Sequence, residues 1–374
     1  MRRLALVLTF GLLVPPMVWS QEHRVGVVSE SGDIVTWLRP VAGGLVVDRV
    51  VPVGVRPADM DGPHNLAVAP DQRSYYITIA HGMPFGTLWR YDATNDTVMG
   101  RAQVELFPTT IALSPDGDWA FVANSDFHGE RPRVNPVTII YTPTMARVTD
   151  LPACDMPHGV RVNHAGTRVY VSCMHSDEIL ELDGGTFEIL RRVPIGSGHA
   201  MPGGHQAHPA RAETAGAAGV PTADLSRECS PTFVSVSPDD RWLYLPCHSG
   251  NLLQIHDAAT LAFVGSVPVG EGPYNAEPTP DGRLVLVTNK KGQSVSLVDP
   301  IGRREVARIP TTKQIVHGIA YAPDGRTAYI SAESIGSDPG SVDVLDLDRR
   351  VMTGTIAIPA QPTGIAVLRL PQLR

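Results

Sequence analysis

The stretch HGIAYAPDGRTAYI, residues 317–330, decides the fold. Its first half predicts a short strand. Pro323-Asp324-Gly325 predicts a tight turn, because proline presets φ and glycine accepts a positive φ. Residues 327–330 contain the β-branched and aromatic side chains that a returning strand prefers. The stretch therefore predicts a β-hairpin.

The same hairpin pattern occurs five more times along the chain, so the protein is built from repeats. The other copies are residues 65–77, 110–121, 159–170, 233–244 and 275–286. Corresponding turn residues are separated by 45, 49, 74, 42 and 43 positions. A period near 43 with four strand-like runs per unit is typical of β-propeller blades. The longest spacing contains an insertion of roughly 30 residues, which we place at 196–228.

The two ends of the chain complete one another. Residues 361–367 supply one strand, and residues 24–29, 33–38 and 45–51 supply three more. Pairing them would protect the ends and remove the open sheet edges. The sequence thus predicts an all-β fold, a seven-bladed β-propeller closed by both termini, with residues 21–374 as a single domain.

Three segments carry a resemblance to a known family. RLVLVTN at 283–289 and WAFVAN at 119–124 are close to a "YVTN" strand, and GQSVSLVD at 292–299 matches the strand that follows it. The chain resembles the YVTN-repeat seven-bladed propellers, which are related to the cytochrome-d1-like propellers. This resemblance covers nearly all of the mature chain. It implies the fold but no single function, since such propellers host many roles.

The first 20 residues predict a secretory signal peptide. Arg2 and Arg3 form the charged start, and the apolar run 4–14 is too short to span a membrane. Cleavage before Gln21 is acceptable; an uncleaved membrane anchor is the alternative. We expect a periplasmic or secreted protein with no membrane span after signal removal.

Charge argues against nucleic acid as a partner. The formal net charge is −7, and it becomes −9 once Arg2 and Arg3 leave with the signal peptide. No basic stripe remains in the mature chain. We expect a monomer.

Four cysteines in an exported protein suggest disulfides. Cys154 and Cys229 precede the first strand of adjacent blades, and Cys173 and Cys247 end the second strand of the same blades. These matched places favour the pairs Cys154–Cys173 and Cys229–Cys247. The two other connectivities stay open.

Histidines gather on one predicted face. The residue seven positions before each turn residue should start the innermost strand and lie at the mouth of the central channel. These residues are His64, Thr109, His158, Thr232, Tyr274 and His317, and Thr363 follows by pattern. His64, His158 and His317 are therefore expected to converge.

Loops on the same face add more imidazole and thioether groups. They carry His81, His128, His175 and His248, and the inserted loop 196–228 adds His199, His205 and His208. Met156 lies two residues before His158, and Met174 precedes His175. Imidazole is the commonest transition-metal ligand, and sulfur donors favour soft ions such as Cu(I).

The sequence therefore predicts a soft transition-metal site, copper first, in a redox or metal-handling role. Its candidate ligands are His64, His158, His317, His81, His175, His248 and Met156. A periplasmic redox or metal-delivery protein would be the partner. The alternatives are a metal-dependent lyase or lactonase acting at the channel mouth and a non-catalytic protein-binding platform. Non-covalent haem is a further option, whereas no Cys-x-x-Cys-His motif for c-type haem is present.

Overall fold

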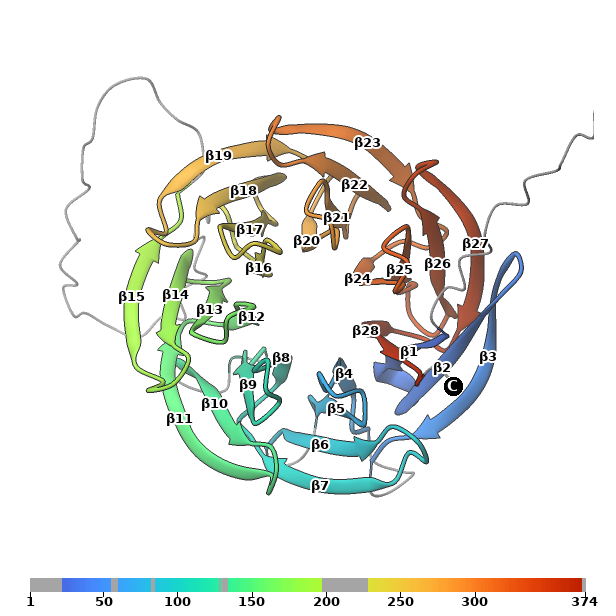
Figure 1. Cartoon of the computed structure of the whole chain (residues 1–374), viewed down its shortest axis with the longest axis horizontal. Coiled ribbons are helices and arrows are strands. Elements are labelled where there is room, and N and C mark those ends of the chain that lie inside the picture. Colours follow the sequence, from blue (N-terminus) through green and yellow to red (C-terminus); the bar gives the residue numbers. More distant parts are fainter. Residues whose placement is uncertain are drawn as a thin grey trace, which may run out of the picture.

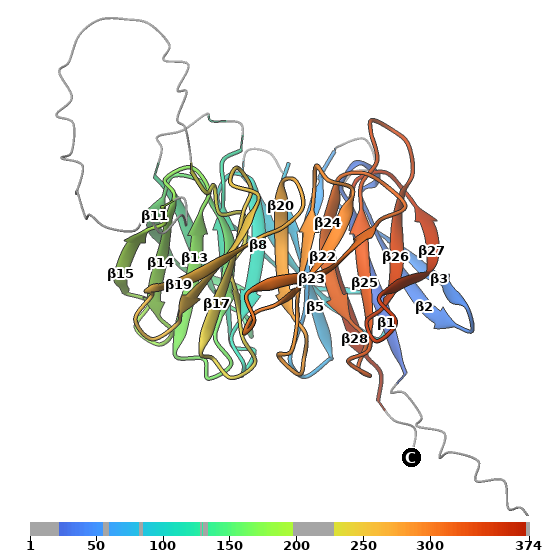
Figure 2. The same cartoon turned by 90° about the horizontal axis from the view of Figure 1, so that it is seen from above.

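Seven four-stranded antiparallel sheets form a ring around a central channel (Figure 1). This architecture confirms the predicted all-β, seven-bladed propeller. Seen from the side, the sheets stand upright around the channel, with their connecting loops at the two faces (Figure 2). The computed structural model describes residues 22–54, 60–81, 85–127, 129, 134–196 and 228–371.

Each blade runs from an innermost strand beside the channel to an outermost strand at the rim (Figure 1). Blade 1 consists of β28 (Pro362–Arg369), β1 (His23–Ser29), β2 (Ile34–Val41) and β3 (Gly44–Pro52). Blade 2 consists of β4 (Pro63–Val68), β5 (Ser74–Ile79), β6 (Thr87–Asp92) and β7 (Val98–Gln103). Blade 3 consists of β8 (Pro108–Leu113), β9 (Trp119–Asn124), β10 (Asn135–Tyr141) and β11 (Ala146–Cys154). Blade 4 consists of β12 (Pro157–Val162), β13 (Arg168–Cys173), β14 (Glu178–Asp183) and β15 (Ile189–Pro194).

The remaining blades repeat this order. Blade 5 consists of β16 (Ser235–Val236), β17 (Trp242–Cys247), β18 (Leu252–Asp257) and β19 (Phe263–Pro268). Blade 6 consists of β20 (Pro273–Pro278), β21 (Val285–Asn289), β22 (Ser294–Asp299) and β23 (Arg304–Pro310). Blade 7 consists of β24 (Val316–Tyr321), β25 (Thr327–Ala332), β26 (Gly340–Asp346) and β27 (Val351–Ile358). One short 3-10 helix, η1 (Glu30–Gly32), follows β1.

The turn between β24 and β25 forms as its sequence dictates. Asp324 Oδ1 accepts hydrogen bonds from the backbone N–H groups of Arg326 and Thr327, at 2.8 and 3.1 Å. Gly325 has a φ of 65°, a left-handed conformation that costs glycine little. The turn sets the pairing of Tyr321 with Ala328.

Alternation along each strand packs neighbouring blades together. In β25, Ile330 joins a cluster with Leu286 and Leu297 of blade 6. The adjacent residue Tyr329 faces the other way and packs with Val25 of blade 1. Successive side chains of a strand point to opposite faces of the sheet, so every blade contributes to two interfaces.

Both ends of the chain close the ring, as predicted. β28 pairs antiparallel with β1, with Arg369 opposite His23 and Val367 opposite Val25. At the other end of this pair, the Glu30 N–H donates to the Gln361 carbonyl across 2.9 Å.

The predicted disulfides are present in adjacent blades. Cys154 pairs with Cys173 and Cys229 with Cys247, with Cα atoms 6.0 and 4.3 Å apart. All four cysteines are therefore oxidised, which fits export to an oxidising compartment.

Several sequence predictions fall outside the described residues. They include the signal peptide 1–20, all of the insertion but its two ends, and His128, His199, His205 and His208. Among the helical residues that are described, no segment has the length and apolar character needed to cross a membrane.

Candidate functional site

The seven predicted mouth residues occupy equivalent places around the channel. Six of them are the second residue of an innermost strand, and Thr232 lies just before the short strand β16. All seven are less than a tenth exposed. They are His64, Thr109, His158, Thr232, Tyr274, His317 and Thr363.

A left-handed residue introduces each of these positions. Met156, two residues before His158, has a φ of 58° and is 4% exposed. Gly62, Phe107 and Gly272 take the same place in other blades, with φ between 50° and 60°. Met156 therefore occupies a backbone bend where the chain enters the blade, and the same bend recurs in the other blades.

Tyr274 connects the histidines of the mouth. Its ring lies 4.5 Å from the His317 ring, measured between centroids, and its hydroxyl lies 3.1 Å from Nε2 of His158. The His317 ring lies 5.6 Å from the His64 ring. The three predicted histidines thus line one mouth, with Tyr274 between His158 and His317.

Hydrogen bonds fix how two of these rings face the channel. His158 Nδ1 lies 2.7 Å from the Thr232 carbonyl oxygen, so this nitrogen donates and Nε2 accepts from Tyr274. His64 Nδ1 lies 2.9 Å from Oε2 of Glu30. A donor at Nδ1 leaves Nε2 with a lone pair, which is how metal-binding histidines are commonly held.

His317 presents a buried nitrogen without a hydrogen-bond partner. Its Nε2 is buried and lacks a partner among the described residues. The nearest acid, Glu333, has Oε1 4.0 Å away. A buried imidazole nitrogen in this state is costly unless something binds it, so His317 is a candidate binding residue.

Burial keeps the inner histidines neutral. It lowers the pKa of His158 to about 3, and the nearby His64 adds to the decrease. Burial lowers the pKa of His317 well below its ordinary value, with a further contribution from Lys290. Burial likewise lowers the pKa of His248, which faces Lys291. Neutral imidazole is the form that binds a metal.

An acidic bridge lies at the lip of the mouth. Glu30 Oε1 lies 2.8 Å from Nε2 of His81, while its other oxygen meets His64. Burial raises the pKa of Glu30, but His64 and His81 outweigh it and hold that pKa well below its usual range. The hydrogen bond to Glu30 raises the pKa of His81. Glu30 is the first residue of the short helix η1. Asp33, which follows η1, accepts a hydrogen bond from the Gly62 N–H across 2.8 Å and so connects the helix to the chain that enters blade 2.

A second ion pair also borders the mouth. Lys290 Nζ lies 3.4 Å from Oε1 of Glu333 and 4.3 Å from the centre of the Tyr274 ring. Glu30, His248, Lys290 and Glu333 are each the first residue after the second strand of a blade. This shared position can be recognised in the sequence. The prediction considered only histidines there and therefore omitted Glu30, Lys290 and Glu333.

One of the other predicted ligands, His175, is engaged by an acidic residue of its own. His175 meets Asp155, with Nδ1 3.6 Å from Oδ1, and its side chain is 33% exposed. The cysteines are held in disulfides and offer no thiolate. Across the described ranges, one group of at least three His, Cys, Asp or Glu residues has ligand atoms all within 4.8 Å of one another, namely Cys154, Cys173 and Glu178. Because these cysteines form a disulfide, that group is not a metal site, and the mouth histidines stand farther apart.

Fold and mouth together define a seven-bladed β-propeller with a histidine-lined channel, and comparison with solved structures agrees on the fold. The periplasmic gluconolactonase of Pseudomonas aeruginosa has a TM-score of 0.71 and 17% identity, over 94% of this chain and 100% of that one. Dihydro-heme d1 dehydrogenase NirN has a TM-score of 0.58 and 16% identity, over 91% of this chain and 74% of that one. The hydrazine synthase of Kuenenia stuttgartiensis has a TM-score of 0.58 and 20% identity, over 79% of this chain and 81% of that one.

These neighbours are seven-bladed propellers as well. At such low identity the likeness establishes the fold and leaves the activity to the site itself. No protein-family model matches the chain, and no curated protein matches it in sequence.

Proposed function

We propose that this is an exported, periplasmic propeller that binds one transition-metal ion at the channel mouth through His64, His158 and His317. One observation carries the proposal: three buried imidazoles from three blades surround one mouth, and Nε2 of His317 has no partner in the described structure. His158 and His64 are held through Nδ1, which turns Nε2 of each ring toward the mouth as the metal donor.

Copper is the metal that we expect. With the cysteines oxidised and Met156 serving a bend, the donor set is mainly nitrogen. Imidazole suits copper, zinc, iron and nickel, and among divalent ions copper binds such sites most tightly. A copper ion would supply one-electron redox chemistry, and a periplasmic redox or metal-delivery protein would then be the partner.

Binding requires a small rearrangement at Tyr274. The hydroxyl now donates to His158 Nε2, the nitrogen that a metal would need. Metal–nitrogen bonds are about 2 Å long, so the rings must also move toward the channel axis. Rotation of the Tyr274 side chain is the step that would admit the ion.

Metal analysis of protein purified from the periplasm tests this proposal. We expect one equivalent of copper, lost in His158→Ala, His64→Ala and His317→Ala and retained in the control His164→Ala. His164 is a matched control because its side chain is 60% exposed and it pairs with Asp240, outside the mouth. Full metal content in all three mouth variants would contradict the site. A Soret band in the absorption spectrum would instead indicate non-covalent haem.

The Lys290–Glu333 pair favours a second candidate, metal-dependent opening of a lactone at the same mouth. In such a reaction Glu333 would accept a proton from water, and the water oxygen would bond to the lactone carbonyl carbon. The ring C–O bond would then break, and Glu333 would return the proton to the departing ring oxygen to give a hydroxy acid. A bound metal would polarise the carbonyl. The structural likeness to a gluconolactonase is a likeness of fold.

A hydrolysis assay separates the two candidates. Lactone opening that depends on added metal, and that falls by about 100-fold in Glu333→Gln, would support the second candidate. Stoichiometric copper without any turnover of lactones would support the first.

A further inference from the structure

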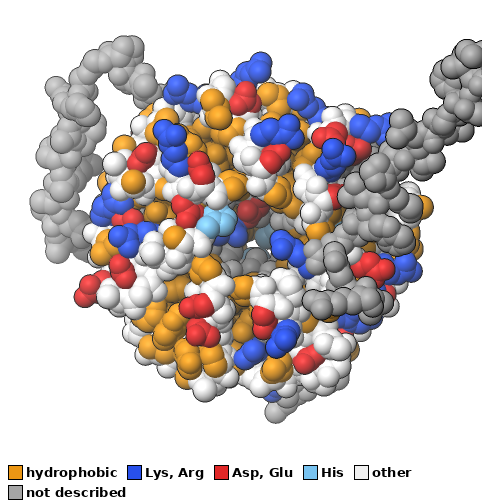
Figure 3. All heavy atoms as spheres, in the orientation of Figure 1, with side chains coloured by type: hydrophobic (Ala, Val, Ile, Leu, Met, Phe, Trp, Pro, Cys, Tyr) orange, Lys and Arg blue, Asp and Glu red, His pale blue; other side chains and the backbone are white. Residues whose placement is uncertain are grey.

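A cavity of about 510 Å³ occupies the channel beyond the mouth histidines. It extends from His317 to Pro70 and Pro115 in the β4–β5 and β8–β9 turns, which lie at the opposite face. Figure 3 shows the ring hollowed at its centre, with histidine, acidic and basic side chains around the hollow. Its volume is within the range of small-molecule sites.

At one level of the channel, small side chains surround a single ion pair between Arg161 and Glu277. Arg161 lies three residues after His158, and Glu277 lies three residues after Tyr274. Four other blades carry alanine at this strand position and also line the cavity, at Ala67, Ala112, Ala320 and Ala366. Small side chains there leave room for Arg161 and Glu277 to meet across the channel, and for a ligand beside them.

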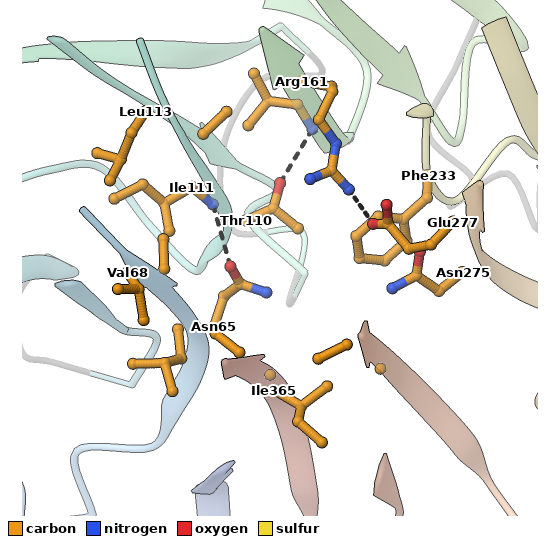
Figure 4. A pocket seen from close by; sticks show the side chains of 18 of the residues that line it. Asn65, Val68, Thr110, Ile111, Leu113, Arg161, Phe233, Asn275, Glu277 and Ile365 are labelled. Carbon is orange, nitrogen blue, oxygen red and sulfur yellow. Dashed lines mark hydrogen bonds and ion pairs between the residues drawn. The ribbon is translucent and has the colours of Figure 1, made fainter. Parts of the chain in front are cut away.

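Two polar atoms beside this cavity lack a hydrogen-bond partner among the described residues. Arg161 Nε and Asn275 Oδ1 are buried and have no hydrogen-bond partner among the described residues. Asn275 is 6% exposed. Figure 4 shows Arg161, Glu277, Phe233 and Asn275 around the same space. One donor and one acceptor beside this cavity therefore have no hydrogen-bond partner among the described residues.

The charges in the cavity disfavour an ionic ligand. The Arg161 guanidinium is already engaged by Glu277 Oε1. Burial raises the pKa of Glu277 against the opposing effect of Arg161, so this carboxylate is poorly solvated. An anionic ligand would face Glu277 and a cationic one would face Arg161, at short range and low dielectric.

Apolar walls complete the site. Ile111, Phe233, Ile319 and Ile365 line the cavity beside the Arg161–Glu277 pair. An aromatic ring and aliphatic side chains suit the C–H faces of a hydroxylated ring, while the polar layer suits its hydroxyl groups.

We propose that this cavity binds a small uncharged polyhydroxylated molecule, such as a monosaccharide or cyclitol. Its hydroxyl groups donate to Asn275 Oδ1 and Glu277, and one of its oxygens accepts from Arg161 Nε. The ligand enters from the face opposite the histidines, and the groups that bind it, Asn275, Glu277 and Arg161, are not the proposed metal ligands, although the cavity ends at His317.

Isothermal titration of the full chain tests the proposal, with myo-inositol and D-glucose as neutral probes and D-gluconate as an anionic one. We expect millimolar or tighter binding of a neutral probe, and binding of gluconate weaker by about tenfold or more. Asn275→Leu and Glu277→Gln should each weaken the neutral probe by about tenfold. Arg283→Met, a change at an exposed arginine, is the control that should bind normally.

The outcomes are distinct. No binding of either neutral probe at millimolar concentration overturns the proposal. Unchanged affinity in both cavity variants places the ligand elsewhere and overturns it as well, and Glu277→Gln, which keeps the side-chain shape, guards against misfolding of Asn275→Leu. Tighter binding of gluconate overturns the neutral class. His158→Ala should lose metal but keep the polyol, so the two proposals fail separately.

Discussion

Tyr274 donates its hydroxyl hydrogen to Nε2 of His158 across 3.1 Å, from blade 6 to blade 4. Burial raises the pKa of Tyr274 well above its ordinary value, so the hydroxyl keeps its proton. The same contact that completes the hydrogen bonding of His158 also occupies the nitrogen that a metal would need. One hydrogen bond, which a metal ion would have to replace, therefore occupies Nε2 of His158.

Removing this hydroxyl should favour metal binding. In Tyr274→Phe the Nε2 of His158 no longer has a competing donor, and a net hydrogen bond is worth about 0.5–1.5 kcal/mol. We expect copper affinity to rise by about threefold to tenfold in a competition titration with a chelator. Tyr321→Phe is the matched control, because that buried hydroxyl donates to the Glu277 carbonyl instead. Weaker copper binding by Tyr274→Phe would show that the hydroxyl helps to hold the metal.

Stability should fall as the solution is acidified, in part through His158. Its folded pKa is about 3 against an ordinary value of 6.5, so between these values the unfolded chain binds a proton that the folded chain refuses. Its contribution is complete above about pH 6.5 and is lost progressively as the pH falls toward 3, at up to about 1.4 kcal/mol per pH unit.

Denaturant titrations across this window measure the effect. His158→Gln should lessen the dependence of the unfolding free energy on pH by up to one proton. Identical slopes for wild type and His158→Gln would mean that His158 titrates normally.

Gly62 should be required for the bridge at the lip. A Cβ at Gly62 would lie 2.1 Å from Cδ2 of His81, and the residue has a φ of 59°. In Gly62→Ala the His81 ring must leave Glu30, and we expect a loss of about 2–4 kcal/mol, from left-handed strain together with a charged hydrogen bond. The pKa of His81, followed by NMR, should fall.

Gly336→Ala is the matched control for this change. Its φ is 64° and nothing lies within 4 Å of an added Cβ, so it reports the backbone strain alone. An equal loss of stability in the two variants would show that the His81–Glu30 contact contributes nothing.

Closure of the ring should govern stability. Deleting residues 361–374 removes β28 and exposes one edge of β1. Ile365 and Leu368 are buried, and such side chains are each worth about 1.5–3 kcal/mol, so we expect a loss of at least about 3 kcal/mol in chemical denaturation. An unchanged unfolding midpoint after the deletion would refute a role of closure in stability.

The fold could be predicted because its determinants are local and repeated. The Pro-Asp-Gly turn at Asp324 and its counterparts mark each blade, and counting back seven residues located His64, His158 and His317 at one mouth. The cysteine pairing followed from the same repetition.

What the sequence did not reveal depends on contacts across the channel. Glu30, Lys290 and Glu333 share a strand position with His248, but only the finished ring brings them beside the histidines. Arg161 and Glu277 are 116 residues apart, and nothing between them indicates that they meet. The repeated bend at Met156 is likewise a backbone feature that thioether chemistry does not indicate.

The pairing of β1 with β28 also fixes the orientation of any tether. His23 and Arg369 lie opposite one another at one end of this pair, whereas Glu30 and Gln361 meet at the other end, beside the histidine mouth. A linker attached at either end of the propeller therefore leaves from the face where the polar cavity opens. Immobilised on an electrode by such a linker, every molecule would turn its histidine mouth toward solution and its cavity toward the support.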